Sequence, residues 1–257
     1  MRMIAPILLS AAALCAAVPL PASTRDAAGL FDKPVKVDRI PLAPDPLNPR
    51  AKPMLSCFHY RGFMVKQIDR GEKGAEQLSI RAVKTGEGKP PCVEANAPGE
   101  KIVDDKDWHG YFKGVKGEKG DYVFFSADDG WNGGVGFAVF GAADGRKRFE
   151  DVAKSIHAVH LTKPKLVLRY RRVYGAPCSL VADAAGCWSK VKRETGLSGK
   201  APGCAAAYRQ EEKKAGANAS GIAADPSVIE YEAETVLDGT RHKTKPRPGK
   251  ITCKPAI

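Results

Sequence analysis

Six of the seven cysteines in this 257-residue chain lie beyond residue 56, and their pairing limits the folds that the chain can adopt. An even number of cysteines in an exported protein predicts disulfide bonds. The chain has no Cys-x-x-Cys pair and no cysteine and histidine cluster at zinc spacing, so we expect no metal site. Six cysteines allow many pairings, and the sequence leaves the choice open. Proximity along the chain favours the pairs Cys57–Cys92, Cys187–Cys204 and Cys178–Cys253.

The first 22 residues have the three parts of a secretory signal peptide. Arg2 supplies the positive start, residues 4–18 form an apolar stretch that contains the seventh cysteine, and residues 19–22 offer small side chains for cleavage. We therefore expect cleavage near Ala22 and a periplasmic or extracellular protein. The alternative is a retained N-terminal anchor. A stable membrane span needs about 20 apolar residues, so we expect no span in the processed chain.

Residues 23–53 have the composition of a linker, and residues 54–257 that of a single β-rich domain. Proline lacks a backbone N–H and cannot donate in a sheet, so a proline-rich run predicts an extended segment without regular strand pairing. The prolines of this run are Pro41, Pro44, Pro46, Pro49 and Pro53.

Apolar and polar side chains alternate over most of the remaining chain, which is typical of strands. We expect strands at residues 55–68, 78–82, 122–127, 135–140, 166–174 and 228–238. Gly62 predicts a bulge in the first of them, and residues 128–134 contain Asp-Gly and Asn-Gly turn signals. The expected fold class is mainly β (α+β), an antiparallel meander in a sandwich or barrel-like body.

Helical signals are confined to about residues 181–215. One helix is expected to end at Gly196 and a second at Gly216, since glycine commonly follows the last helical residue. Together they predict an α-helical hairpin, linked by disulfides and inserted before the last strands.

Three glutamates, Glu230, Glu232 and Glu234, share one face of the strand expected at residues 228–238. Carboxylates spaced evenly along a strand do not converge on one point, which disfavours a cation site. We expect instead an acidic ladder facing the arginines of a neighbouring strand, such as Arg169 and Arg171. Each such pair contributes roughly 0.2 to 1 kcal/mol.

The formal net charge of +12 predicts attraction to anionic surfaces. For an exported protein these are anionic envelope polymers and glycans. Nucleic acid is not an expected partner, and the chain has no nucleic-acid-binding motif. The C-terminal segment concentrates the charge in a basic patch that either binds a polyanion or is a solvated loop: Arg241, Lys243, Lys245 and Arg247.

A second candidate site combines aromatic, amide and carboxylate side chains. Carbohydrate sites pair an aromatic surface with groups that hydrogen-bond to hydroxyls. The alternative is an ordinary hairpin turn with aromatic residues packed beneath it. The candidate ligand-binding residues are Trp108, His109, Asp128, Asp129, Trp131 and Asn132.

The sequence contains no nucleophile elbow, Walker A loop or dinucleotide-binding glycine motif, so we predict neither catalytic residues nor a cofactor. The leading hypothesis is a non-catalytic, basic envelope protein that binds an anionic or glycan ligand or a protein partner. One alternative is a hydrolase that acts on an envelope glycan through Asp128 or Asp129. Another is a structural module of an envelope assembly.

Overall fold

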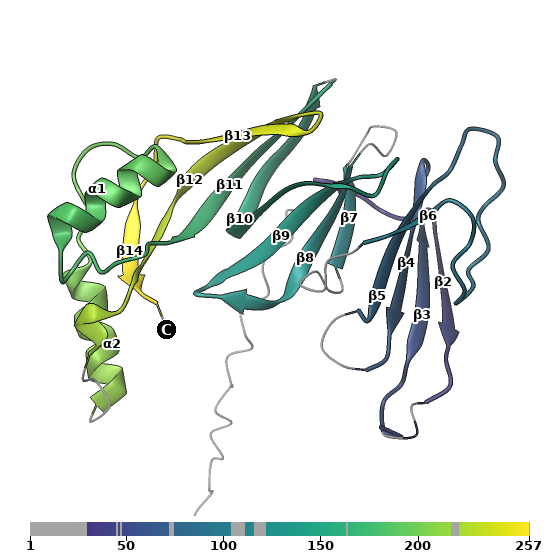
Figure 1. The fold of residues 1–257 in the computed structure, drawn as a ribbon, viewed down its shortest axis with the longest axis horizontal. Helices are drawn as coiled ribbons and strands as arrows, with labels where there is room; N and C mark the ends of the chain where they lie inside the picture. Colours follow the sequence, from purple (N-terminus) through teal and green to yellow (C-terminus); the bar gives the residue numbers. More distant parts are fainter. Residues whose placement is uncertain are drawn as a thin grey trace, which may run out of the picture.

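The computed structural model describes residues 30–44, 46, 48–71, 75–103, 111–115, 122–162, 164–216 and 221–256. These residues form two antiparallel sheets and two α-helices, and the helices lie together at one end of the molecule (Figure 1). The expected fold class, mainly β with an inserted disulfide-linked helical region, is confirmed.

The smaller sheet has five strands in chain order among the described residues. They are β2 (Lys36–Pro41), β3 (Met54–His59), β4 (Phe63–Asp69), β5 (Gln77–Ala82) and β6 (Glu100–Ile102).

The larger sheet has nine strands in the described part of the chain, and neighbours along it are mostly consecutive in sequence. They are β1 (Phe31–Asp32), β7 (Tyr111–Val115), β8 (Tyr122–Trp131), β9 (Gly134–Gly141), β10 (Lys147–Thr162), β11 (Lys165–Gly175), β12 (Ser227–Asp238), β13 (Arg241–Pro246) and β14 (Thr252–Pro255).

Strand β10 joins the two halves of the larger sheet because different parts of it pair with different neighbours. Residues 147–153 pair with β9, and residues 153–162 pair with β11. Register shifts interrupt both pairings, and such bulges bend a strand and increase its twist. Strand β13 also contacts β10, and the His242 and Phe149 rings lie 5.1 Å apart.

The two faces of the larger sheet are covered differently. One face carries the largest apolar core, in which Leu168 packs with Trp188 and Tyr208 from the helices. Among the described side chains, the opposite face meets the smaller sheet over β8 and β9, through residues such as Phe125 and Phe140. Strand register continues this second face onto β10–β13, and no described residue of those strands belongs to the core between the sheets. The smaller sheet therefore leaves this part of the face uncovered.

Two expectations for the first part of the chain are wrong. Strand β2 lies inside the segment expected to be a linker, and it pairs with β3 along its whole length. Pairing is possible because Pro41 is the last residue of β2, where a missing N–H costs little. Residues 55–68 form two strands rather than one, and Gly62 lies in the turn between them.

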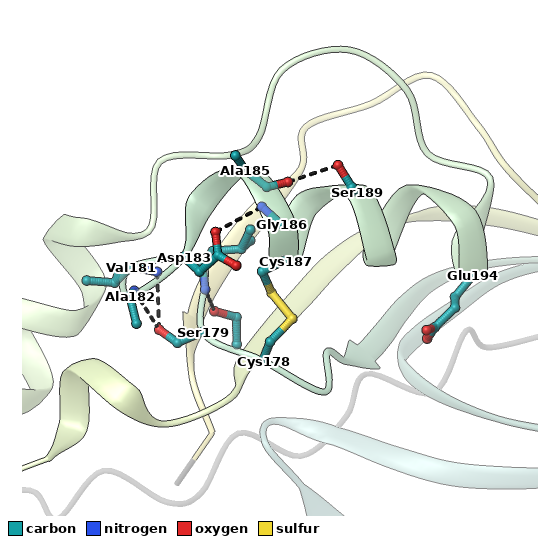
Figure 2. Close-up of a disulfide and its surroundings, with 12 residues drawn as sticks. Cys178, Ser179, Val181, Ala182, Asp183, Ala185, Gly186, Cys187, Ser189 and Glu194 are labelled. Carbon is teal, nitrogen blue, oxygen red and sulfur yellow. Dashed lines mark hydrogen bonds between the residues drawn. A yellow bond between two sulfur atoms is a disulfide. The ribbon is translucent and has the colours of Figure 1, made fainter.

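The helical hairpin is confirmed, with α1 at Ala184–Thr195 and α2 at Ala205–Ala215. Asp183 begins α1 by accepting a hydrogen bond from the Gly186 N–H, as Figure 2 shows. A Cβ at Gly186 would lie 2.3 Å from that carboxylate, so any other residue there would require the Asp183 side chain to move. Gly196 ends the helix with a φ of 75°. In the described part of the chain, no helix combines the length and apolar character needed to cross a membrane.

Tyr208 fixes the helical hairpin to the sheet. Its hydroxyl donates to the Asp225 carbonyl and contacts the Ser227 hydroxyl at 2.7 Å, and Ser227 also accepts from the Leu180 N–H. Ser227 is fully buried and cannot bond to water. The groups in this contact therefore satisfy one another's hydrogen bonds.

One expected disulfide is present and two expected pairings are wrong. Cys57–Cys92 forms as expected, whereas the other bonds are Cys178–Cys187 and Cys204–Cys253. Cys178 lies before α1 and is bonded to Cys187 in the first turn of that helix (Figure 2). Cys204 precedes α2, which packs beside β14 and so brings Cys253 within a Cα distance of 5.0 Å.

An ion pair buried beneath the loop at residues 83–99 supplements the Cys57–Cys92 bond. Lys66 Nζ lies 2.6 Å from a Glu100 carboxylate oxygen, and both side chains are 1% exposed. The same ammonium donates to the carbonyl of Ala95, and the Ser79 hydroxyl donates to Glu100. A buried charge is tolerated when it is paired and hydrogen-bonded, so these contacts hold the loop against the smaller sheet.

The two C-terminal disulfides differ in the loops that they close, which predicts unequal contributions to stability. Cys204–Cys253 closes 49 residues and Cys178–Cys187 only 9. In the chain-entropy model their removal costs roughly 4 and roughly 2.5 kcal/mol respectively. We expect the double variant Cys204→Ala/Cys253→Ala to lose more free energy of unfolding in urea than Cys178→Ala/Cys187→Ala. The opposite order would show that local packing, not loop closure, sets their contributions.

Candidate functional site

The charged face is the part of the larger sheet on β10–β13 that the smaller sheet leaves uncovered. Strands β11 and β12 pair without a register shift, which places Arg169 opposite Glu234 and Arg171 opposite Glu232. Their side chains form ion pairs of 2.9 Å and 3.3 Å. The expected acidic ladder facing neighbouring arginines is therefore confirmed.

Glu234 is the centre of the charged face. Its carboxylate lies 3.1 Å from Lys245 Nζ, 2.9 Å from Arg169 Nε and 2.7 Å from the Arg247 guanidinium. Hydrogen bonds from Lys245 and Arg169 lower the pKa of Glu234 from 4.5 to about 2. One carboxylate thus orders three cations but neutralises only one unit of their charge.

Glu230 repeats this arrangement further along β12. Lys154 Nζ lies 3.0 Å from its carboxylate and Arg171 Nε lies 3.2 Å away. Burial works against the ionised form, but the hydrogen bonds and charge of Lys154 and Arg171 still lower the pKa of Glu230. The carboxylates hold the cations in fixed positions instead of cancelling them.

The outer strand β13 adds cations that the ladder does not pair. Its register places Arg241 and Lys243 on the same face as Lys245, and both are exposed. Among the described residues, no ion pair includes Arg241 or Lys243. Among the described residues, cations outnumber carboxylates on this face, which carries Lys154, Lys165, Arg169, Arg171, Arg241, Lys243, Lys245 and Arg247 beside Glu230, Glu232, Glu234 and Asp238.

The structure places the sequence-predicted basic patch in a strand, not in an irregular loop. Arg241, Lys243 and Lys245 lie on β13, and Arg247 follows its last residue. Lys245 and Arg247 both contact Glu234, whereas the other two form the exposed edge. The patch and the acidic ladder, which are separate features in the sequence, form one surface.

The candidate ligand-binding residues near Trp131 are only partly described. Trp108, His109 and the side chain of Asp128 lie outside the described residues. Asp129 is exposed on β8. The turn expected over residues 128–134 is shorter than predicted, because β8 continues to Trp131 and only Asn132 and Gly133 turn the chain.

That two-residue turn also explains the choice of amino acids. Asn132 has a φ of 50° and Gly133 a φ of 79°, so both lie in the left-handed region. A hairpin turn of this kind strongly favours Asn-Gly. Trp131, immediately before it, is 45% exposed and lies against Gly175 of β11.

A buried polar network on the opposite face of the larger sheet has no counterpart in the sequence analysis. The Tyr170 hydroxyl donates to Asp151 at 2.6 Å, and Arg172 Nε lies 2.8 Å from the same carboxylate. Arg172 also donates to the Tyr231 hydroxyl. Burial, together with the charge of Asp151, raises the pKa of Tyr170. One feature of the sequence points to this network: Arg172 is a charged residue on the face of β11 that also carries the apolar Leu168 and Tyr170.

This network stabilises the fold instead of presenting a ligand site. Asp151 of β10 is paired with Arg172 of β11, and the Tyr170 hydroxyl also contacts Thr235 of β12 at 2.9 Å. The network therefore fastens three neighbouring strands to one another, and its charges cancel.

No group of three or more metal-ligating side chains is found in the described ranges. Comparison with known protein families, curated proteins and solved structures finds no match to this chain. The functional argument therefore depends on the charged face itself.

The lowered pKa of Glu234 predicts how stability depends on pH. A carboxyl group with a folded-state pKa of about 2 instead of 4.5 stabilises the fold fully above pH 4.5 and loses this contribution as the pH falls towards 2. We expect the free energy of unfolding to fall between pH 5 and pH 2. Glu234→Gln should be less stable at pH 7 and show a flatter pH profile, measured by urea unfolding.

Glu212→Gln on α2 is the matched control, since Glu212 lies away from the charged face. It should keep the wild-type pH profile. Parallel profiles for wild type and Glu234→Gln would contradict the prediction.

Proposed function

We propose that this chain is an exported, non-catalytic protein that binds an anionic polymer through the charged face. The observation that supports this most directly is the pair of exposed cations on β13, Arg241 and Lys243, beside the ordered row of Lys245, Glu234 and Arg169. A surface with excess positive charge attracts polyanions over distances set by the ionic strength.

The ordering of the cations also supports binding. A flexible lysine or arginine loses side-chain freedom when it pairs with a ligand, and this loss weakens binding. Arg169 is already held by Glu234, yet it remains 45% exposed. Lys245 is likewise held by Glu234 and is 58% exposed. A polymer could therefore contact cations whose positions the acidic ladder has already restricted.

Export is supported by the leader-like first 22 residues and by the three disulfides. Such bonds persist in oxidising compartments outside the cytoplasm. This location makes anionic envelope polymers and glycans the accessible partners, and nucleic acid a poor one. We propose cleavage near Ala22 and a periplasmic or extracellular location.

The two alternative functions receive no specific support from the described residues. For the hydrolase, the side chain of Asp128 is not described and Asp129 is exposed on a strand. For a structural module, the large exposed apolar residues should form one patch. Among the described residues these side chains come from the smaller sheet and its loop, from the β8–β9 hairpin and from the segment before α1: Val35, Ile40, Val93, Ile102, Trp131 and Val181.

Export can be tested with the full chain expressed in a Gram-negative host. We expect the recovered protein in the periplasm or medium, with an N-terminus near residue 23 and six alkylation-resistant cysteines in the absence of reductant, both measured by mass spectrometry. A chain beginning at residue 23 should remain in the cytoplasm. Recovery of the full chain from the cytoplasm with reduced thiols would contradict the proposal.

Polymer binding can be tested with immobilised polygalacturonate and immobilised polyphosphate. We expect the oxidised protein to bind both, with affinity that falls as salt rises. Arg241→Glu/Lys243→Glu should weaken binding about tenfold or more, because each cation near an anionic surface contributes on the order of 1 kcal/mol. The readout is the dissociation constant at low and high salt.

Lys213→Glu/Lys214→Glu on α2 is the matched control, because it makes the same change in net charge away from the charged face. It should change the dissociation constant less than the β13 variant does. Equal losses would show that overall charge, and not this face, drives binding. Absence of binding by the wild type to both polymers would overturn the proposed function.

A further inference from the structure

Trp131 lies at one end of the charged face. Along β11, Arg169, Arg171, Val173 and Gly175 point to the same side, because side chains alternate along a strand whose pairing with β12 has no shift. A Cβ at Gly175 would lie 2.4 Å from Cη2 of the Trp131 ring. The indole therefore lies on the charged face, with the Cη2 edge of its ring against Gly175.

The absence of a side chain at position 175 lets the indole pack against the strand and still remain accessible. Trp131 is 45% exposed, although it is in contact with β11. The hairpin that carries it is also in contact with the strand. A Cβ at Gly134, its pairing partner across the turn, would lie 2.7 Å from Val173. The result is an aromatic side chain that is held at one edge of its ring by β11 and is 45% exposed.

Cations begin beside this aromatic surface and continue along the sheet. Lys254 Nζ lies 3.1 Å from the Cβ position of Gly133, in the turn next to Trp131. Arg171 and Arg169 follow along β11. At a rise of about 3.3 Å per residue, their backbones lie about 13 and about 20 Å from that of Gly175. A ligand that contacts both the indole and Arg169 must therefore be extended.

We propose that the charged face binds an acidic polysaccharide, with a sugar ring stacked on Trp131 and its acidic groups paired with Lys254 and the arginines and lysines beyond it. This inference rests on the proposed function and specifies its ligand. The apolar face of a sugar ring packs against an aromatic side chain, while arginine and lysine pair with carboxylates. An acidic polysaccharide presents both groups at regular intervals along one chain.

Other polyanions match this surface less completely. Polyphosphate has no ring to cover the indole. A membrane surface would take up tryptophan and cations, but interfacial binding also needs a broad apolar area. Among the described residues, Trp131 is the one large exposed apolar side chain on the charged face, since the others lie on different segments. A polysaccharide needs only this single ring.

The test compares polygalacturonate, polyphosphate and anionic phosphatidylglycerol vesicles as ligands for the oxidised protein. Trp131→Ala should weaken binding of polygalacturonate roughly tenfold and leave binding of polyphosphate within about twofold, because stacking is lost while the cations remain. Gly175→Ala keeps the tryptophan but displaces its ring, and it should reproduce the selective loss. Val181→Ala, which removes an exposed apolar side chain elsewhere, should bind both polymers as the wild type does.

The outcomes separate this inference from the proposed function. Unchanged binding of both polymers by Trp131→Ala and Gly175→Ala overturns the role of the indole and leaves polyanion binding intact. Binding of vesicles, but not of polygalacturonate, in a Trp131-dependent manner overturns the choice of ligand. Failure of the wild type to bind any polymer removes both proposals together. Urea unfolding of each variant shows whether a loss of binding comes from the site or from the fold, and Trp131→Phe should retain part of the affinity if stacking is responsible.

Discussion

The unbroken antiparallel register between β11 and β12 is the constraint on which the rest of the structure depends. It runs from Lys165 opposite Asp238 to Gly175 opposite Val228 without a shift. A slip of one residue would move every side chain of one strand to the other face. The observed register instead places Leu168 and Tyr170 in the core and Arg169 and Arg171 on the charged face.

The environment of this strand pair determines which face is free to bind. The helical hairpin, fixed by Tyr208 and by two disulfides, packs on the apolar side. In the described part of the chain, the smaller sheet packs on the other side at β8 and β9. The register shifts of β10 lie between the covered part and the uncovered part, so one continuous sheet supplies both a sandwich core and an open charged surface.

Stability and binding are coupled on the charged face. Excess cations on neighbouring strands repel one another, and the carboxylates of Glu230 and Glu234 offset that repulsion. Because each of these carboxylates contacts more than one cation, the face keeps its positive charge while its side chains are ordered. The indole of Trp131 adds an apolar contact at the end of this surface, and the proposed ligand follows from that combination.

The sequence by itself determined the features that depend on neighbouring residues. Alternation predicted the strands and the acidic ladder, glycine after each helix predicted the ends of α1 and α2, and Asn132-Gly133 was a turn signal that the structure retains. Only the tertiary structure decided the pairing of Cys178 and Cys204, the strand within the proline-rich segment, and the contact of Trp131 with Gly175. Local patterns record the backbone preference of a few adjacent residues, whereas these contacts join residues that only the packing of sheets and helices brings together.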